Sequence, residues 1–142
     1  EKLGASMIDF AGWSMPVRYG SIVEEHREVR ERAGLFDISH MGVLEVSGRG
    51  AAWFLDTVCS NYLPWIGDGE SQYGYLLDVD GGVIDDVMVY RAEENRYLLV
   101  VNAANGEKDL AWLNAVNNGE VLIDLNRPDL RVLRPATLRD LR

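Results

Sequence analysis

Apolar and polar positions in the middle of the chain alternate in the way that is typical of hairpin-linked strands. The segment from Val83 to Tyr90 (VIDDVMVY) is rich in β-branched and aromatic residues and follows Gly81 and Gly82, so it predicts a strand that leaves a tight turn. Strands are predicted before and after it, at 72–78 and 96–102. These three segments form a meander, and shorter strands are predicted at 43–47 and 121–125.

Three other segments, at 21–34, 50–59 and 105–116, have apolar residues at helical spacing. Ser21 and Glu24 fit a capping box at the start of the first helix, and Gly34 is its predicted C-cap. The residues predicted to face inward are Ile22, His26, Val29 and Ala33 in the first helix, Ala51, Phe54, Leu55 and Val58 in the second, and Leu110, Leu113 and Val116 in the third. Helices and hairpin-linked strands are mixed without strict βαβ alternation, which predicts an α+β fold with a mainly antiparallel sheet and flanking helices.

The adjacent Asp85 and Asp86 are the most informative feature of the predicted strands. Neighbouring side chains of a strand point to opposite faces. The two faces are therefore Val83, Asp85, Val87 and Val89 on one side, and Ile84, Asp86, Met88 and Tyr90 on the other. A carboxylate in an apolar setting is costly unless it is paired or hydrogen-bonded. One interpretation is structural, with one aspartate capping a turn and the other pairing with an arginine; the other is an acid, a base or a ligand anchor in a cleft.

Length and charge restrict the classes of function. The chain has 142 residues, which suits one domain, and a formal net charge of −9, which argues against non-specific nucleic-acid binding. The strongly apolar stretches are far shorter than a membrane crossing requires, so no membrane association is expected. Arginines crowd the C-terminal segment, which is expected to be a solvated segment at the edge of a larger protein, with a functional basic tail as the alternative; they are Arg127, Arg131, Arg134, Arg139 and Arg142.

The cysteine and histidine content argues against disulfide and metal chemistry. Cys59 is the only cysteine, which excludes an internal disulfide and is compatible with a reducing compartment; its neighbours Leu55 and Val58 predict a buried, inert thiol. His26 and His40 are the only histidines and lie in different predicted elements, so no metal site is predicted. The sequence also lacks the glycine-rich motifs of nucleotide-binding loops.

Some single residues have both a structural and a functional interpretation. Asn102 ends the apolar run YLLVVN, where it either opens the following helix or presents its amide to a ligand near the end of the sheet. Tyr73, Tyr75 and Tyr90 are expected in the core or at its rim, and Trp13 is expected to be a packing anchor.

Five segments, in order along the chain, resemble the aminomethyltransferase (T-protein) family of the glycine cleavage system. They are DFAGWSMPVRY from Asp9, EEHREVRERAGLFDISHMG from Glu24, QYGYLLD from Gln72, DGGVIDDVMVYR from Asp80 and RYLLVVNAANGEKD from Arg96. The resemblance extends to about Gly119, and the segment after Asn126 matches poorly.

The resemblance implies a folate-dependent enzyme that takes an aminomethyl group from the lipoyl arm of a partner, the H-protein. The one-carbon unit passes to tetrahydrofolate, which gives methylenetetrahydrofolate, ammonia and the dihydrolipoyl arm. The family's second aspartate in the GGxxDD motif contacts folate and is catalytic, and it matches Asp86. Other residues of the folate site match Met41, Tyr73 and Asn102. Asp85, on the opposite face, is then expected to bind an arginine or a backbone amide.

The resemblance also implies that residues 1–142 are the N-terminal part of the folate-binding region of a longer, three-domain protein. In the family, the second half of the sequence supplies a glutamate for the pterin edge and arginines for the site. These 142 residues alone are therefore not expected to catalyse the transfer. A bacterial member is expected in the cytoplasm, and a eukaryotic one in the mitochondrial matrix.

Two other functions remain open. The first is that of the dimethylglycine- and sarcosine-oxidising enzymes and folate-dependent demethylases, which share the fold and the EEH and SHMG segments. The second is a non-catalytic folate-binding module, of the kind found in iron–sulfur protein maturation. Its KGCYxGQE signature is absent here, but its place in the family's sequence is beyond Arg142. The aspartate pair and the VVN segment favour the aminomethyltransferase.

Overall fold

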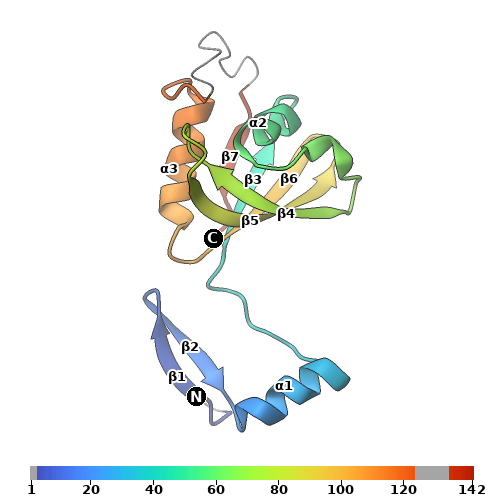
Figure 1. Ribbon diagram of the computed structural model, residues 1–142, viewed down its shortest axis with the longest axis vertical. Helices are drawn as coiled ribbons and strands as arrows, with labels where there is room; N and C mark the ends of the chain where they lie inside the picture. Colours follow the sequence, from blue (N-terminus) through green and yellow to red (C-terminus); the bar gives the residue numbers. More distant parts are fainter. Residues whose placement is uncertain (1–2, 124–134) are drawn as a thin grey trace. The chain divides into compact units, whose positions relative to one another are not determined.

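Two compact units make up the chain, and the computed structural model describes residues 3–123 and 135–142. Unit 1 comprises Glu1–His40 and unit 2 comprises Met41–Arg142 (Figure 1). Of the helices in the described residues, none is long and apolar enough to cross a membrane. The paired aspartates lie in unit 2, so the candidate site is built there.

An antiparallel hairpin opens unit 1, formed by β1 (Ser6–Phe10) and β2 (Trp13–Arg18). The turn residues Ala11 and Gly12 both have positive φ, 52° and 82°, as the tightest hairpin turns require. This hairpin is not predicted by the sequence pattern, because neither strand has a fully buried face that a period-two pattern could reveal. Trp13 is 43% exposed, so its interpretation as a packing anchor is wrong within unit 1.

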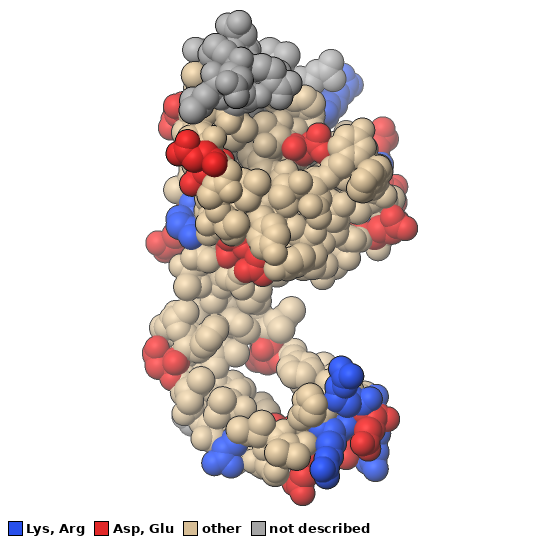
Figure 2. Space-filling view, viewed as in Figure 1, with Lys and Arg blue, Asp and Glu red and all other residues tan. Residues whose placement is uncertain are grey.

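Helix α1 (Ile22–Glu31) confirms the first predicted helix but not its ends. Ser21 makes no side-chain capping bond; instead the carboxylate of Glu25 accepts the backbone N–H groups of Tyr19 and Gly20. The carboxylate of Glu25, one residue after the predicted Glu24, therefore takes the place of the predicted capping box. The helix ends at the C-cap Arg32, short of Gly34, and none of its residues is buried. Figure 2 shows basic side chains of α1 gathered beside acidic ones.

Unit 2 is built on a five-stranded antiparallel sheet in the order β4-β5-β6-β3-β7. The strands are β3 (Gly42–Ser47), β4 (Ser71–Leu77), β5 (Val83–Glu93), β6 (Arg96–Val101) and β7 (Thr137–Asp140). Strands β4, β5 and β6 are the predicted meander. The α+β fold with a mainly antiparallel sheet is therefore confirmed.

Two helices, α2 (Ala51–Val58) and α3 (Gly106–Asn117), cover one face of this sheet, and a short 3₁₀ helix (Leu63–Trp65) follows α2. The inward residues predicted for α2 and α3 are buried, with Leu110 only partly so. They pack on the strand residues Leu44, Val46, Leu76, Val87, Val89, Tyr97, Leu99 and Val101. Each such side chain contributes roughly 1.5–3 kcal/mol by leaving water. This face therefore holds unit 2 together.

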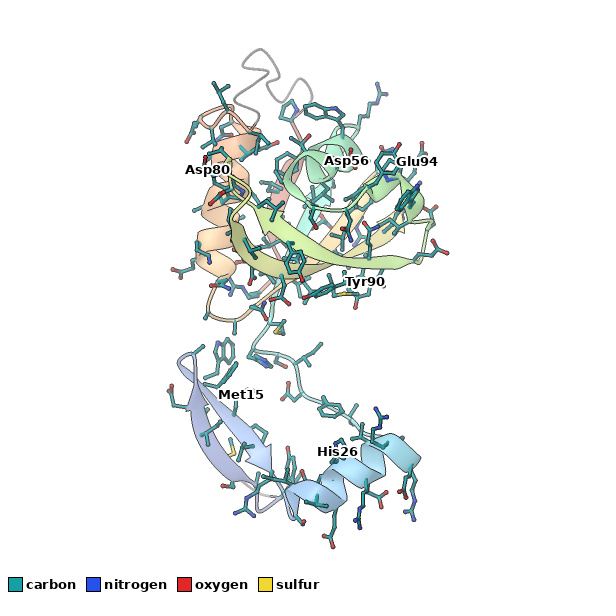
Figure 3. All side chains as sticks on the ribbon, viewed as in Figure 1. Met15, His26, Asp56, Asp80, Tyr90 and Glu94 are labelled. Carbon is teal, nitrogen blue, oxygen red and sulfur yellow. The ribbon has the colours of Figure 1, made fainter. Side chains whose placement is uncertain are left out.

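The opposite face of the sheet is open. Tyr73, Tyr75, Asp86 and Tyr90 lie on it with much of their surface exposed. Tyr90 leaves β5 on the side away from α2 (Figure 3). The expectation that these tyrosines lie in the core or at its rim is wrong, because they lie on the face opposite to the core.

The C-terminal part of unit 2 differs from the prediction. Residues 121–123 of the strand predicted at 121–125 are irregular, and 124–125 lie outside the described residues. The last strand is β7, which was not predicted and pairs with β3, with Arg139 opposite Glu45. At four residues, β7 is too short for a clear alternating pattern. Of the C-terminal arginines, Arg142 pairs with Asp140 at 2.8 Å, and Arg127, Arg131 and Arg134 lie outside the described residues.

Candidate functional site

A tight turn fixes where β5 begins. The carboxylate of Asp78 accepts the backbone N–H groups of Asp80 (2.9 Å) and Gly82 (2.7 Å). Gly81, between them, has a φ of 81°, in the left-handed region that favours glycine. The turn therefore has a defined length, and β5 starts at Val83.

A β-bulge then decides which side chains of β5 point inward. Leu76 pairs with Asp85, but Leu77 pairs with Val83, so Ile84 is an extra residue in β5. The bulge interrupts the alternation, and Val83 is 63% exposed. The prediction that Val83 shares a buried face with Asp85 is wrong for this reason. After the bulge the alternation is regular, with Asp85 inward and Asp86 outward.

The carboxylate of Asp86 lies on the open face and is held by two donors. Tyr75 lies directly opposite Asp86 on β4. The Tyr73 hydroxyl donates to Oδ2 of Asp86 (3.2 Å), and the Asn102 side-chain amide donates to Oδ1 (3.0 Å). One donor acts on each oxygen, so the carboxylate is oriented while it remains exposed to solvent.

Tyr73 is suited to remain a donor. Its ring meets that of Tyr75 edge to face, with 5.6 Å between centroids. The neighbouring Tyr75 hydroxyl, partial burial and the Asp86 carboxylate together raise the pKa of Tyr73 to about 12. The phenol therefore stays protonated at neutral pH. Half of the Tyr73 surface is exposed, which leaves the ring open to a ligand.

Asp85 faces the core and is only 4% exposed. Its Oδ2 accepts the backbone N–H of Asn102 (3.0 Å), and its Oδ1 accepts the side-chain amides of Asn102 (2.9 Å) and Asn105 (2.6 Å). Burial alone would raise the pKa of Asp85, but these bonds and one from Asp109 outweigh it and lower the pKa. The expected backbone amide partner is thus confirmed, and asparagines take the place of the expected arginine.

Asn102 connects the two aspartates. Besides the bonds above, its side-chain amide donates to the backbone carbonyl of Asp86 (3.1 Å). Met41 lies at the same end of the sheet, because Gly42 pairs with Val101 and the two residues flank that pair. The structure therefore joins Asp86, Tyr73 and Asn102 by hydrogen bonds and places Met41 at the same sheet end, partly buried.

Two residues at the start of α3 also contact this arrangement and were not predicted from the sequence. Lys108 donates to the backbone carbonyl of Ile84 (2.8 Å), at the bulge. Asp109 is completely buried, and burial followed by its interaction with Asp85 raises its pKa to about 7. The spacing of Asp109 with Leu113 and Val116 was the available signal, since it places a carboxylate on the inward stripe of a helix.

The other candidates have no part in this arrangement. Cys59 is only partly buried, and burial, with a smaller effect of Asp56, raises the pKa of its thiol to about 12, so the thiol is protonated at neutral pH. That the cysteine is inert stays a prediction. His26 is exposed on α1, and within residues 3–123 and 135–142 no three His, Cys, Asp or Glu side chains gather to hold a metal ion.

Comparison with known proteins gives matches that cover most of the chain. The family model described as the GCVT N-terminal domain matches residues 1–133. An aminomethyltransferase of Chloroherpeton thalassium is 47% identical over 129 residues, which cover 91% of this chain and 36% of that protein. An aminomethyltransferase of Geobacillus kaustophilus is 51% identical over 120 residues, covering 84% of this chain and 33% of that protein.

A solved structure agrees with both. The glycine cleavage system aminomethyltransferase T of Bartonella henselae superimposes with a TM-score of 0.79 at 34% identity, over 99% of this chain and 35% of that one. The chain spans about one third of the length of the curated relatives that it matches. With a family model that matches nearly all of its residues, the chain belongs to the aminomethyltransferase family of the glycine cleavage T-protein, as its GCVT N-terminal domain.

Proposed function

We propose that this chain supplies the folate-contacting carboxylate of a glycine cleavage aminomethyltransferase. The complete enzyme moves the one-carbon unit of an aminomethyl group on the lipoyl arm of the H-protein to tetrahydrofolate. The one-carbon unit forms two carbon–nitrogen bonds to folate, and its bonds to the lipoyl sulfur and to the amine nitrogen break. Of the two protons that the folate N–H groups lose, one goes to the lipoyl thiol and the other to the ammonia that leaves. Relatives named aminomethyltransferase support the reaction class, and their bacterial sources support a cytoplasmic location.

The observation that carries the proposal is the oriented carboxylate of Asp86 on an open sheet face. Tyr73 and Asn102 each donate to one oxygen of this carboxylate. The carboxylate is therefore already oriented and needs little rearrangement when a positive charge develops nearby. A folate nitrogen becomes positively charged as it attacks the one-carbon unit. The proposed role of Asp86 is to hydrogen-bond and aim that nitrogen and to stabilise the charge.

The residues around Asp86 are suited to a flat, partly polar ligand. We assign the half-exposed ring of Tyr73 and the side chain of Met41 to packing against the folate rings. The amide nitrogen of Asn102 already serves the two aspartates, so its carbonyl oxygen is the part that we assign to a folate donor. A neighbouring surface of Tyr75 and Tyr90 extends the same face.

The direct test uses the complete gene product. Aminomethylated H-protein is incubated with the enzyme, with and without tetrahydrofolate, and ammonia and dihydrolipoyl thiol are measured. The proposal predicts that ammonia release depends on tetrahydrofolate and matches the thiol formed. Tight folate binding without turnover would instead support a demethylase or a non-catalytic folate-binding module.

A further inference from the structure

Behind the open face, polar side chains continue from Asp86 into the core. Asn102 bonds Asp86 on one side and Asp85 on the other, and Asp85 interacts with Asp109 of α3. The chain of contacts thus runs from an exposed carboxylate to a completely buried one. Its significance rests on the function proposed for Asp86.

Asn102 cannot turn without breaking contacts to both aspartates. Its amide nitrogen lies 2.9 Å from Oδ1 of Asp85 and 3.0 Å from Oδ1 of Asp86. A primary amide has only two N–H donors, so these two acceptors, with the backbone carbonyl of Asp86, use its donor capacity. The position of the Asp86 carboxylate therefore depends on where Asp85 holds Asn102.

Asp85 in turn needs a partner on its buried side. Asp109 is 0% exposed, and neither of its oxygens receives an N–H from the described residues. Two buried carboxylates side by side cannot both be charged at low cost. A proton on Asp109 resolves this, because the neutral carboxyl then donates to Asp85. The pKa of Asp109, raised first by burial, and the pKa of Asp85, lowered by its hydrogen bonds, both agree with a proton on Asp109.

Helix α3 fixes this pair against β5. Lys108, the neighbour of Asp109, donates to the carbonyl of Ile84 at the bulge, 2.8 Å away. Asn105, one turn before Asp109, donates to Oδ1 of Asp85 at 2.6 Å. The start of α3 therefore contacts both residues of β5 that precede Asp86, Ile84 through Lys108 and Asp85 through Asn105.

We propose that Asp109 and Asp85 share one proton and act as positioning residues, holding Asp86 in its working orientation through Asn102. Neither residue touches the folate or the one-carbon unit. A purely structural role for the pair would stabilise unit 2 without any selective effect on the reaction.

The test compares variants of the complete enzyme that keep or remove the buried donor. Asp109→Asn retains an N–H for Asp85, whereas Asp109→Leu fills the volume without a donor. Val116→Ala, in the buried part of the same helix but away from the pair, is the control for lost stability. Each variant is measured for kcat, for KM of tetrahydrofolate and for melting temperature.

We expect Asp109→Leu to lower kcat by about tenfold or more, since small misplacement of a reacting group is costly, and to change KM little. Asp109→Asn should restore most of kcat, and Val116→Ala should lower the melting temperature while kcat stays near that of the wild type. Equal kcat losses in the leucine and asparagine variants, or a normal kcat in the leucine variant, would overturn the proposal.

A pH profile gives a second readout. The charged and titratable groups around the pair are Asp86 on β5, Glu107 and Lys108 on α3, and Arg142, which lies against Gly106. Burial, followed by the interaction with Asp85, raises the pKa of Asp109 to about 7. The ratio of wild-type kcat to Asp109→Asn kcat should therefore fall as pH rises through 7, and a constant ratio would contradict proton sharing.

Crystal structures of the complete variants separate this inference from the proposed function. The distance between the Asn102 amide and Asp86 should lengthen in Asp109→Leu and be kept in Asp109→Asn. This result would stand even if the enzyme fails to use tetrahydrofolate. An unchanged distance in Asp109→Leu would overturn the positioning role even if aminomethyl transfer is demonstrated.

Discussion

The two faces of the unit 2 sheet differ more than their sequences suggest. One face lies under α2 and α3, and the carboxylate of Asp85 on that face is engaged by N–H groups of the protein. The other face is open, and the carboxylate of Asp86 on it keeps its exposed surface although two donors orient it. Adjacent residues of one type thus differ in exposure and in hydrogen-bond partners because the strand points them to different surroundings.

The largest expected difference between the faces is in packing. Leu99 of β6 is completely buried, whereas its neighbour Leu98 is on the open face and partly exposed. Leu99→Ala should lower the free energy of unfolding by about 3 kcal/mol, because it removes buried surface and leaves a cavity. Leu98→Ala should cost about 1 kcal/mol or less. Denaturant unfolding measures both, and equal losses would mean that the open face is also a core.

The next difference concerns the two aspartates. Asp85→Ala leaves buried donors of Asn102 and Asn105 without their acceptor, so it should lower the free energy of unfolding by about 2–3 kcal/mol. Asp86→Ala removes an exposed carboxylate and should change that free energy by about 0.5 kcal/mol. Denaturant unfolding of both variants measures this difference. A larger loss of unfolding free energy in Asp86→Ala than in Asp85→Ala would contradict the assignment of the two faces.

On the open face, the two tyrosines should differ in effect on activity. The Tyr73 hydroxyl bonds Asp86, whereas Tyr75 meets Tyr73 by its ring edge. Tyr73→Phe should lower kcat of the complete enzyme by about tenfold, equivalent to about 1.4 kcal/mol. Tyr75→Phe keeps the ring contact and should stay closer to the wild type. The order of the two kcat values is the measurement, and the reverse order would exclude Tyr73 as the main orienting phenol.

The last expected difference is a pH dependence of stability on the buried face. Asp109 has a folded-state pKa of about 7, above its ordinary value of 3.8, so the folded protein binds the extra proton between those values. Its contribution to stability is therefore fully present below about pH 4 and is lost as pH rises to about 7. Asp109→Asn has no such proton.

The melting temperature of Asp109→Asn relative to the wild type should thus rise from pH 4.5 to pH 7.5. Asp86→Asn, on the open face, serves as the control in the same buffers. If the melting temperature of Asp109→Asn minus that of the wild type is constant or falls as pH rises, Asp109 is charged in the folded protein.

Part of this arrangement could be predicted from the sequence. Strict alternation in β5 correctly assigned Asp85 and Asp86 to opposite faces, and apolar spacing found the inward residues of α2 and α3. These features follow from local periodicity and burial. The functions of Asp86, Tyr73, Asn102 and Met41 came from the family resemblance, and they stay predictions.

Other features depend on contacts that periodicity does not encode. The bulge at Ile84 arises from the pairing of two strands, so the exposure of Val83 was missed. The strand β7 is short and pairs with β3 across a long stretch of sequence. The partner of Asp85 was expected to be an arginine or a backbone amide, because nothing local shows that Asn105 and Asp109 arrive from α3.

The role of Asp86 is tested most directly by one comparison in the complete enzyme. Asp86→Asn keeps the shape of the side chain and removes its charge, and Asp80→Asn makes the same change at the exposed turn between β4 and β5 (Figure 3). Folate binding and tetrahydrofolate-dependent ammonia release are measured for both. We predict that Asp86→Asn binds folate but loses on the order of 10²-fold in transfer rate, while Asp80→Asn matches the wild type. An unchanged transfer rate in Asp86→Asn would contradict the account.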